Sequence, residues 1–176
     1  IVSLDGTVEQ CAVFFDDVRV PQSGRVGEEN AGWAVAKHLL KHERGGSAQG
    51  PSLLSGIRKI RRAAAETPSG FGDMLSEDPA FQRKLGALEA EIHSFNHYEK
   101  LALSGGDPSH DPAFPSIKKT IGSELSQQIS AMMIDVAGLE GLPRQLDALR
   151  VGANVEPLGS DFDLLAMPYY LNARAT

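Results

Sequence analysis

Glu43 is the residue whose position most suggests chemistry. It lies on a stripe with a spacing of three or four residues, as on the core-facing side of a helix, whose apolar members are Trp33, Ala36 and Leu40. A carboxylate among apolar side chains is costly unless it is paired or used, and a general base is one such use. The small residues on the same side leave room for a ligand; they are Gly46, Ser47 and Gly50. Glu43 is therefore a candidate base, with an ion pair to a neighbouring helix or a position at the edge of the stripe as the alternatives.

The histidines offer a second possible site. Five are present, and four form two pairs at a spacing of four residues, His38 with His42 and His93 with His97. That spacing places both members of a pair on one helix face, where two rings can share a metal ion. Because neither Glu-x-x-His nor His-Glu-x-x-His occurs, we prefer solvated or interhelical histidines and predict no metal.

Composition excludes several classes of protein. The 176 residues are 41% hydrophobic and 23% charged, as in a globular domain with a core. Their net charge of −6 argues against a nucleic-acid partner held by phosphate neutralisation. The single cysteine, Cys11, excludes an internal disulfide. No apolar run is long enough to span a bilayer, so we expect a soluble protein.

Two kinds of element must position Glu43. Residues 1–20 are rich in strand-forming side chains around a turn at Asp5 and Gly6, which predicts a β-hairpin. From Asn30, the expected N-cap, the periodicity becomes helical. Because proline disrupts a helix interior, this first helix should bend or break at Gly50-Pro51.

Three further helices are predicted. One begins at Asp78-Pro79 and carries an apolar seam of Phe81, Leu85, Leu88, Ile92, Phe95 and Ala102. Another begins near Ser116 and ends at Gly138, with a seam of Ile117, Ile121, Leu125, Ile129, Met132 and Val136. The last covers residues 162–175. We therefore expect a mostly α fold, an up-and-down four-helix bundle with a short N-terminal β-hairpin.

Longer strings of sequence carry more specific information. Residues 13–21 read Val-Phe-Phe-Asp-Asp-Val-Arg-Val-Pro, residues 27–33 read Gly-Glu-Glu-Asn-Ala-Gly-Trp, and residues 42–44 read His-Glu-Arg. Together they resemble the acyl-CoA dehydrogenase family, where such a string joins the middle β-domain to the C-terminal bundle. Residues 117–138 are similar to the family's third bundle helix, and residues 169–176 to the stretch before its closing Tyr-Gly-Gly or Tyr-Glu-Gly motif.

The resemblance implies a domain organisation and a base. Residues 1–22 would be the end of the middle β-domain, and residues 23–176 a C-terminal helical bundle domain truncated at its C-terminus. The family's base is a glutamate that lies just beyond Thr176 in some members. In others it precedes an arginine on the first bundle helix, which matches Glu43 and Arg44. The resemblance thus implies Glu43 as the catalytic base and Arg44 as a residue near the substrate.

The family's flavin-contact segments are altered in this chain. Its Arg-x-x-Phe-Gly stretch is replaced by residues 66–72, which lack that arginine. Its Gln-x-x-Gly-Gly segment, a flavin contact across the dimer, corresponds to a stretch that begins at Asp135 and includes Gly138 and Gly141. The resemblance implies these three as cofactor-binding positions, and the changes suit a subunit that pairs with a different partner chain.

The resemblance thus implies that this chain is part of a cytoplasmic, FAD-dependent acyl-CoA dehydrogenase of fatty acid metabolism. Such an enzyme converts an acyl-CoA thioester to the 2,3-enoyl-CoA. The implied partners are acyl-CoA, the electron-transferring flavoprotein and further subunits in a homo- or hetero-oligomeric dimer of dimers. The isolated chain is expected to be inactive. The alternative is a non-catalytic bundle subunit or oligomerisation module of a heteromeric complex.

Overall fold

The computed structural model describes residues 1–8, 10–46, 48–70 and 72–175, without the side chains of residues 41, 42 and 44–46. These residues form five α-helices and no β-strand. The helices are α1 (Gly32–Gly46), α2 (Gly50–Glu66), α3 (Pro79–Leu103), α4 (Phe114–Ala137) and α5 (Asp161–Asn172). Short 3-10 helices join them, among them η4 (Gly138–Gly141) directly after α4. The predicted mostly α fold is confirmed.

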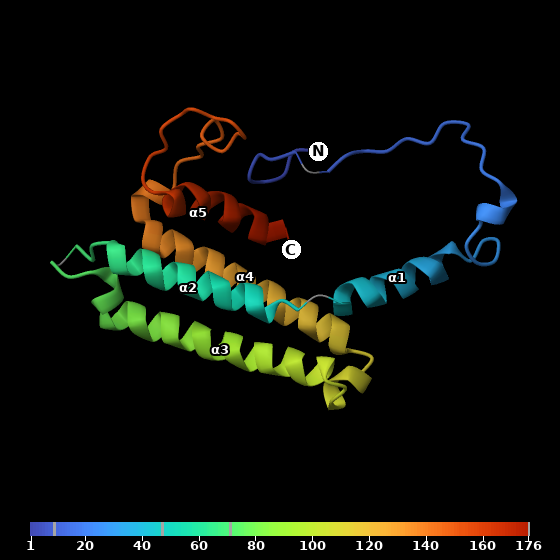
Figure 1. Cartoon of the computed structure of the whole chain (residues 1–176), viewed down its shortest axis with the longest axis horizontal. Coiled ribbons are helices and arrows are strands. Elements are labelled where there is room, and N and C mark those ends of the chain that lie inside the picture. The colour runs from blue at the N-terminus through green and yellow to red at the C-terminus, as the bar shows by residue number, and fades with distance from the viewer. Residues whose placement is uncertain (9, 47, 71, 176) are drawn as a thin grey trace.

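The four helices α2 to α5 form the bundle, and α3, α4 and α5 each run opposite to the preceding helix (Figure 1). Helices α2, α3 and α4 pack on one another, and α5 packs on α4. Their facing side chains make one apolar core, whose most buried large members are Ile57, Ile60, Ile92, Ile129 and Met132. None of the described helices has the length and the apolar character needed to cross a membrane.

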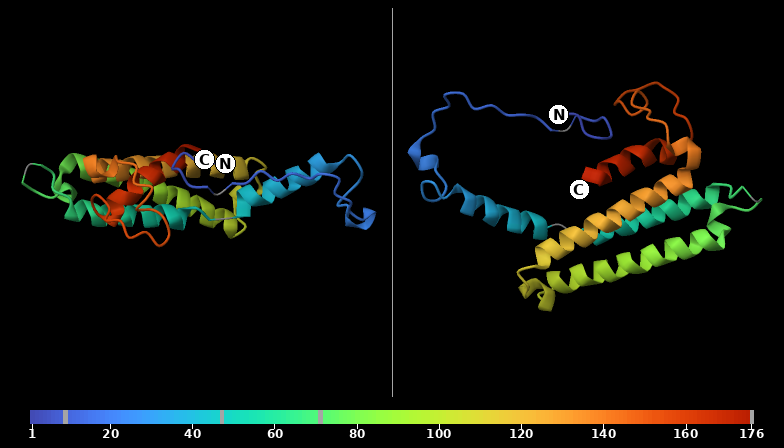
Figure 2. Two further views of the ribbon diagram at one scale, coloured as in Figure 1. Left: turned by 90° about the horizontal axis from the view of Figure 1, so that it is seen from above. Right: turned by 180° about the vertical axis from the view of Figure 1, so that it is seen from behind.

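Helix α1 projects from this bundle. Its end nearest α2 lies beside the first half of α4, and its other end extends away (Figures 1 and 2). The break predicted at Gly50-Pro51 is confirmed, because α1 ends at Gly46 and α2 begins at Gly50. Asn30 is not the N-cap that was predicted. It has a φ of 63° in the connection before α1, a conformation that asparagine tolerates better than most residues.

The predicted β-hairpin is wrong for the described part of residues 1–20. The turn is present, since the Gly6 N–H donates to Ser3 O and the Ser3 N–H donates to Thr7 O, both at 2.9 Å. No strand ladder continues from it. The apolar side chains beyond the turn are exposed, among them Val13, Phe14 and Phe15. A two-stranded hairpin is marginal without a third strand or a helix to cover it, and the described residues do not cover these side chains.

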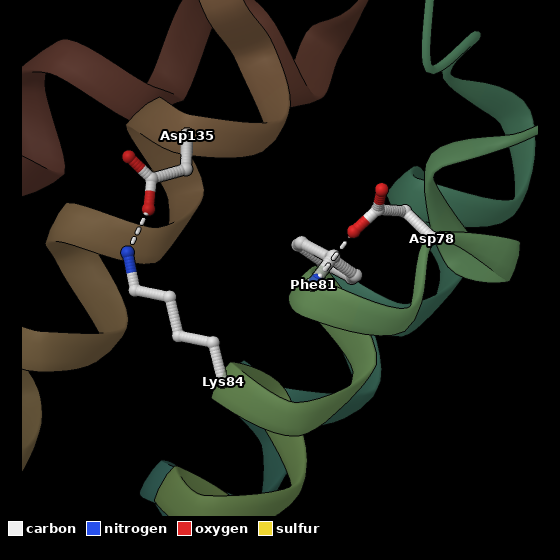
Figure 3. Close-up of polar contacts among 4 residues, drawn as sticks. All are labelled: Asp78, Phe81, Lys84 and Asp135. Carbon is white, nitrogen blue, oxygen red and sulfur yellow. Dashed lines mark hydrogen bonds and ion pairs between the residues drawn. The ribbon is translucent and has the colours of Figure 1, made fainter. Parts of the chain in front are cut away.

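Capping side chains mark the first turns of α3 and α5. The Asp78 carboxylate accepts a hydrogen bond of 2.7 Å from the Phe81 N–H at the start of α3, as predicted (Figure 3). Ser160 and Asp163 form a reciprocal capping box at the start of α5. Pro168 lies inside α5, which ends at Asn172, three residues earlier than predicted.

The seam of α4 is only partly as predicted. Leu125, Ile129, Met132 and Val136 are buried. In the first turns, however, Ile117 and Ile121 are exposed, and the buried positions are Lys118 and Gly122. This shift by one residue brings a charged side chain into the bundle.

Candidate functional site

Glu43 lies in the last turn of α1 and is exposed. The stripe that predicted its burial does not face a core in this chain, because Trp33 and Leu40 are exposed as well. The side chain of Arg44 and the whole of Ser47 lie outside the described residues. Glu43 therefore stands on the helix that leaves the bundle, on a face that the described residues do not cover.

The start of α2, seven residues after Glu43, is fixed by a buried carboxylate. Glu99 of α3 accepts a hydrogen bond of 3.0 Å from the Gln49 N–H at Oε1 and one of 2.6 Å from the Gly50 N–H at Oε2. The first N–H groups of a helix have no partner within the helix and carry partial positive charge. Glu99 therefore caps α2 from a neighbouring helix.

Lys118 of α4 completes this arrangement. Its Nζ lies 3.3 Å from Glu99 Oε1, and the side chains of Lys118 and Glu99 are only 3% and 2% exposed. A buried carboxylate needs such partners, since an unpaired charge away from water is strongly unfavourable. Three helices thus meet at one carboxylate: α3 supplies it, α2 supplies the N–H groups and α4 supplies the cation.

Two glycines allow the helices to approach here. A Cβ atom on Gly50 would lie 2.9 Å from Asn96 Cα, which is closer than real Cβ atoms come to a backbone. A Cβ atom on Gly122 would collide with the side chain of Gln49. Gly50 and Gly122 therefore place the start of α2 tightly between α3 and α4.

The sequence analysis did not identify Glu99 or Lys118. A signal was available for Glu99, which occupies the position on the α3 seam between Phe95 and Ala102. A charged residue on an apolar seam indicates a buried partner. No comparable signal marked Lys118, because the isoleucine beside it fits the same helical period.

The three positions assigned to the cofactor lie at the other end of α4. Asp135 forms an ion pair with Lys84 of α3 (Figure 3). Gly138 has a φ of 57° and ends α4, which favours glycine. A Cβ atom on Gly141 would lie 2.5 Å from Ala137 Cβ and 3.4 Å from that of Ala166 in α5. Each position thus has a structural role of its own.

A groove of about 1490 Å³ runs over α4 between α2 and α5. Asp135 and Gly138 line it, but Gly141 does not. FAD carries a diphosphate, which a carboxylate at Asp135 would repel unless Lys84 neutralises it. Lys84 supplies that neutralisation in this structure, and the described residues do not form a complete cofactor site.

The structure does not bring the two candidate regions together. Helix α1, which carries Glu43, lies beside the first half of α4 (Figures 1 and 2), whereas Asp135 and Gly138 lie at the far end of α4. Elsewhere, the described residues contain no group of three His, Cys, Asp or Glu side chains that could hold a metal ion. Cys11 is exposed.

Comparison with known sequences identifies the family. The sequence profile of "Acyl-CoA dehydrogenase, C-terminal domain" matches residues 30–156. Acyl-CoA dehydrogenase FadE26 of Mycobacterium tuberculosis is 31% identical over 138 residues, which are 76% of this chain and 34% of the relative. Acyl-CoA dehydrogenase IpdE1 of the same organism is 27% identical and covers 81% of this chain and 36% of the relative.

A mammalian acyl-CoA dehydrogenase is also similar to this chain. The human mitochondrial very long-chain specific acyl-CoA dehydrogenase is 28% identical over 145 residues, 79% of this chain and 22% of the relative. No solved structure matches the chain significantly. The chain spans about a third of the length of its bacterial relatives. Since the family profile covers most of its helices, the chain belongs to the acyl-CoA dehydrogenase family and carries the C-terminal helical domain.

Proposed function

We propose that this chain is part of an FAD-dependent acyl-CoA dehydrogenase that converts acyl-CoA thioesters to 2,3-enoyl-CoA. The observation that carries the proposal is the position of Glu43. This glutamate, followed by Arg44 as in one group of family members, lies in the matched segment at the end of α1 and is exposed. It is available to a substrate from outside the bundle.

Glu43 is the base that removes the α-proton. A carboxylate needs hydrogen-bonding reach to that proton, and closure of the rest of the protein over α1 would exclude water from the site. Arg44 lies near the thioester or the CoA arm. FAD, when bound, would supply the acceptor for the β-hydride.

The remaining assignments follow from the family. Residues 1–22 belong to the middle β-domain, and residues 23–176 to the helical domain. Asp135, Gly138 and Gly141 belong to the edge of a flavin site that another subunit completes, in a dimer of dimers. The electron-transferring flavoprotein reoxidises the flavin, and the enzyme acts in fatty acid metabolism in the cytoplasm.

The ion pair between Asp135 and Lys84 favours one alternative function. An aspartate held by a lysine does not offer the N–H donors of the glutamine that the family has there. A subunit that has lost its flavin contact can serve as a non-catalytic bundle or oligomerisation module of a heteromeric complex.

The absorbance spectrum of the full-length protein tests the proposal. We expect flavin bands that bleach when acyl-CoA is added without oxygen. Purified, correctly assembled protein without flavin, or with flavin that no acyl-CoA reduces, would support the non-catalytic alternative instead.

A further inference from the structure

We propose that Glu99 and Lys118 are positioning residues that hold the catalytic helix α1 in place. This inference rests on the proposed role of Glu43 as the base. The buried pair does not touch the substrate. It acts through the start of α2, which follows the end of the helix that carries Glu43.

The helical structure is interrupted between α1 and α2. Because α1 ends at Gly46 and α2 begins at Gly50, α1 is not held by a continuous hydrogen-bond ladder. The direction in which α1 leaves the bundle depends on what fixes the residues after the break. Those residues are Gln49 and Gly50, and both donate their N–H groups to Glu99.

Helix α4, which supplies the cation, also contacts α1. The end of α1 nearest α2 lies beside the first half of α4 (Figures 1 and 2), and Lys118 lies in that half. Helix α4 therefore supports α1 directly by contact and indirectly through Lys118, Glu99 and the start of α2. Both supports act within one region of the bundle.

The ion pair of Glu99 and Lys118 does more than an apolar pair could do. Apolar residues of similar volume often replace a buried ion pair without loss of stability. They cannot, however, accept hydrogen bonds from Gln49 and Gly50. The pair is thus suited to fixing a backbone position, and a displacement of about 1 Å at a catalytic group can slow a reaction about 10²-fold.

The test uses the full-length protein with the double substitution Glu99→Leu and Lys118→Met, which removes both charges together. Thermal melts and circular dichroism verify folding, titration measures acyl-CoA binding, and stopped-flow absorbance measures flavin reduction. We expect a folded protein with unchanged acyl-CoA binding and flavin reduction slowed by at least about 10-fold. Glu99→Gln, which keeps one acceptor oxygen, should give an intermediate rate.

The matched control is the ion pair between Arg61 of α2 and Glu89 of α3, which is more exposed. Replacement of both by glutamine removes a charge pair between bundle helices without touching the start of α2. The reduction rate of this variant should equal that of the unaltered protein.

A second variant displaces the start of α2 without removing a charge. Gly50→Ala places a Cβ atom against the Asn96 backbone, so α2 must move, and reduction should slow again. An unchanged reduction rate in either folded variant would overturn the proposal. Loss of folding in both would also overturn it, because the pair would then serve stability alone.

Glu43→Gln, measured in parallel, separates the two proposals. If Glu43→Gln leaves the rate of flavin reduction unchanged, the proposed base is wrong. Glu99 and Lys118 would then have no catalytic group on α1 to position. If Glu43→Gln slows reduction and the folded Glu99/Lys118 variant does not, only the positioning role is wrong.

Discussion

Gly56 of α2 lies so close to Ile129 of α4 that a Cβ atom on Gly56 would be 3.0 Å from Ile129 Cγ2. Ile129 is fully buried and β-branched, so it has little freedom to move. We expect Gly56→Ala to lower the free energy of unfolding by about 1 kcal/mol through overpacking.

Gly86 of α3 provides the matched control for that substitution. It is exposed and helical, and a Cβ atom there would meet no neighbour within 4 Å. Gly86→Ala should therefore raise the free energy of unfolding by about 0.5–1 kcal/mol. Urea denaturation measures both, and equal effects would contradict the close contact between α2 and α4.

Ile92 tests the core of the bundle. It lies on α3 and is completely buried. Ile92→Ala should cost about 2–5 kcal/mol, because it removes buried surface and leaves a cavity. Leu103→Ala, at an exposed position near the end of the same helix, should change stability by less than about 0.5 kcal/mol. Similar losses for the two variants would show that α3 does not face the core as described.

Asp5 links the N-terminal turn to α5 and gives a pH dependence. Its burial raises the pKa of the carboxyl, but hydrogen bonds from the Thr7 backbone and side chain and from Asn172 outweigh this effect, so the pKa lies below its usual value. The carboxylate therefore stabilises the docked turn above the ordinary pKa of about 3.9, and this stabilisation is lost as the pH falls through the lower folded value.

NMR measures this transition through the Asn172 side-chain amide protons. Their shifts should stay constant at neutral pH and change only below about pH 3.9. Asp5→Asn should abolish the change. A midpoint above that value would contradict the hydrogen-bonded carboxylate.

Local signals in the sequence were sufficient for most helix boundaries. Proline and a capping aspartate correctly placed the start of α3, and Gly50-Pro51 correctly placed the break before α2. These features depend on neighbouring residues alone, which is why they are visible without a structure.

Which face of α4 is buried near α1 depends on residues that are distant in the sequence. The sequence pattern of α4 alone therefore did not reveal it. Ile117 and Ile121 fit the period of α4 as well as Lys118 and Gly122 do. The choice between the two faces is made by Glu99, which needs a cation, and by Gln49, which needs the space at Gly122. The predicted hairpin was wrong for a related reason, because strands need partners that residues 1–20 do not find among the described residues.

The isolated chain should bind no FAD tightly and should not turn over acyl-CoA. Asp135 and Gly138 line only one side of an open groove, and Glu43 is exposed. Circular dichroism of this chain should still be dominated by helix. Purified protein that is yellow and active would show that residues 1–176 form a complete site.

Glu43→Gln in the full-length protein tests whether Glu43 is the catalytic base. Glutamine keeps the shape of the side chain and removes its basicity. Stopped-flow absorbance should show flavin reduction by acyl-CoA slowed by at least about 10²-fold, with substrate binding little changed. A reduction rate equal to that of the unaltered protein would contradict the assignment and place the base on another residue.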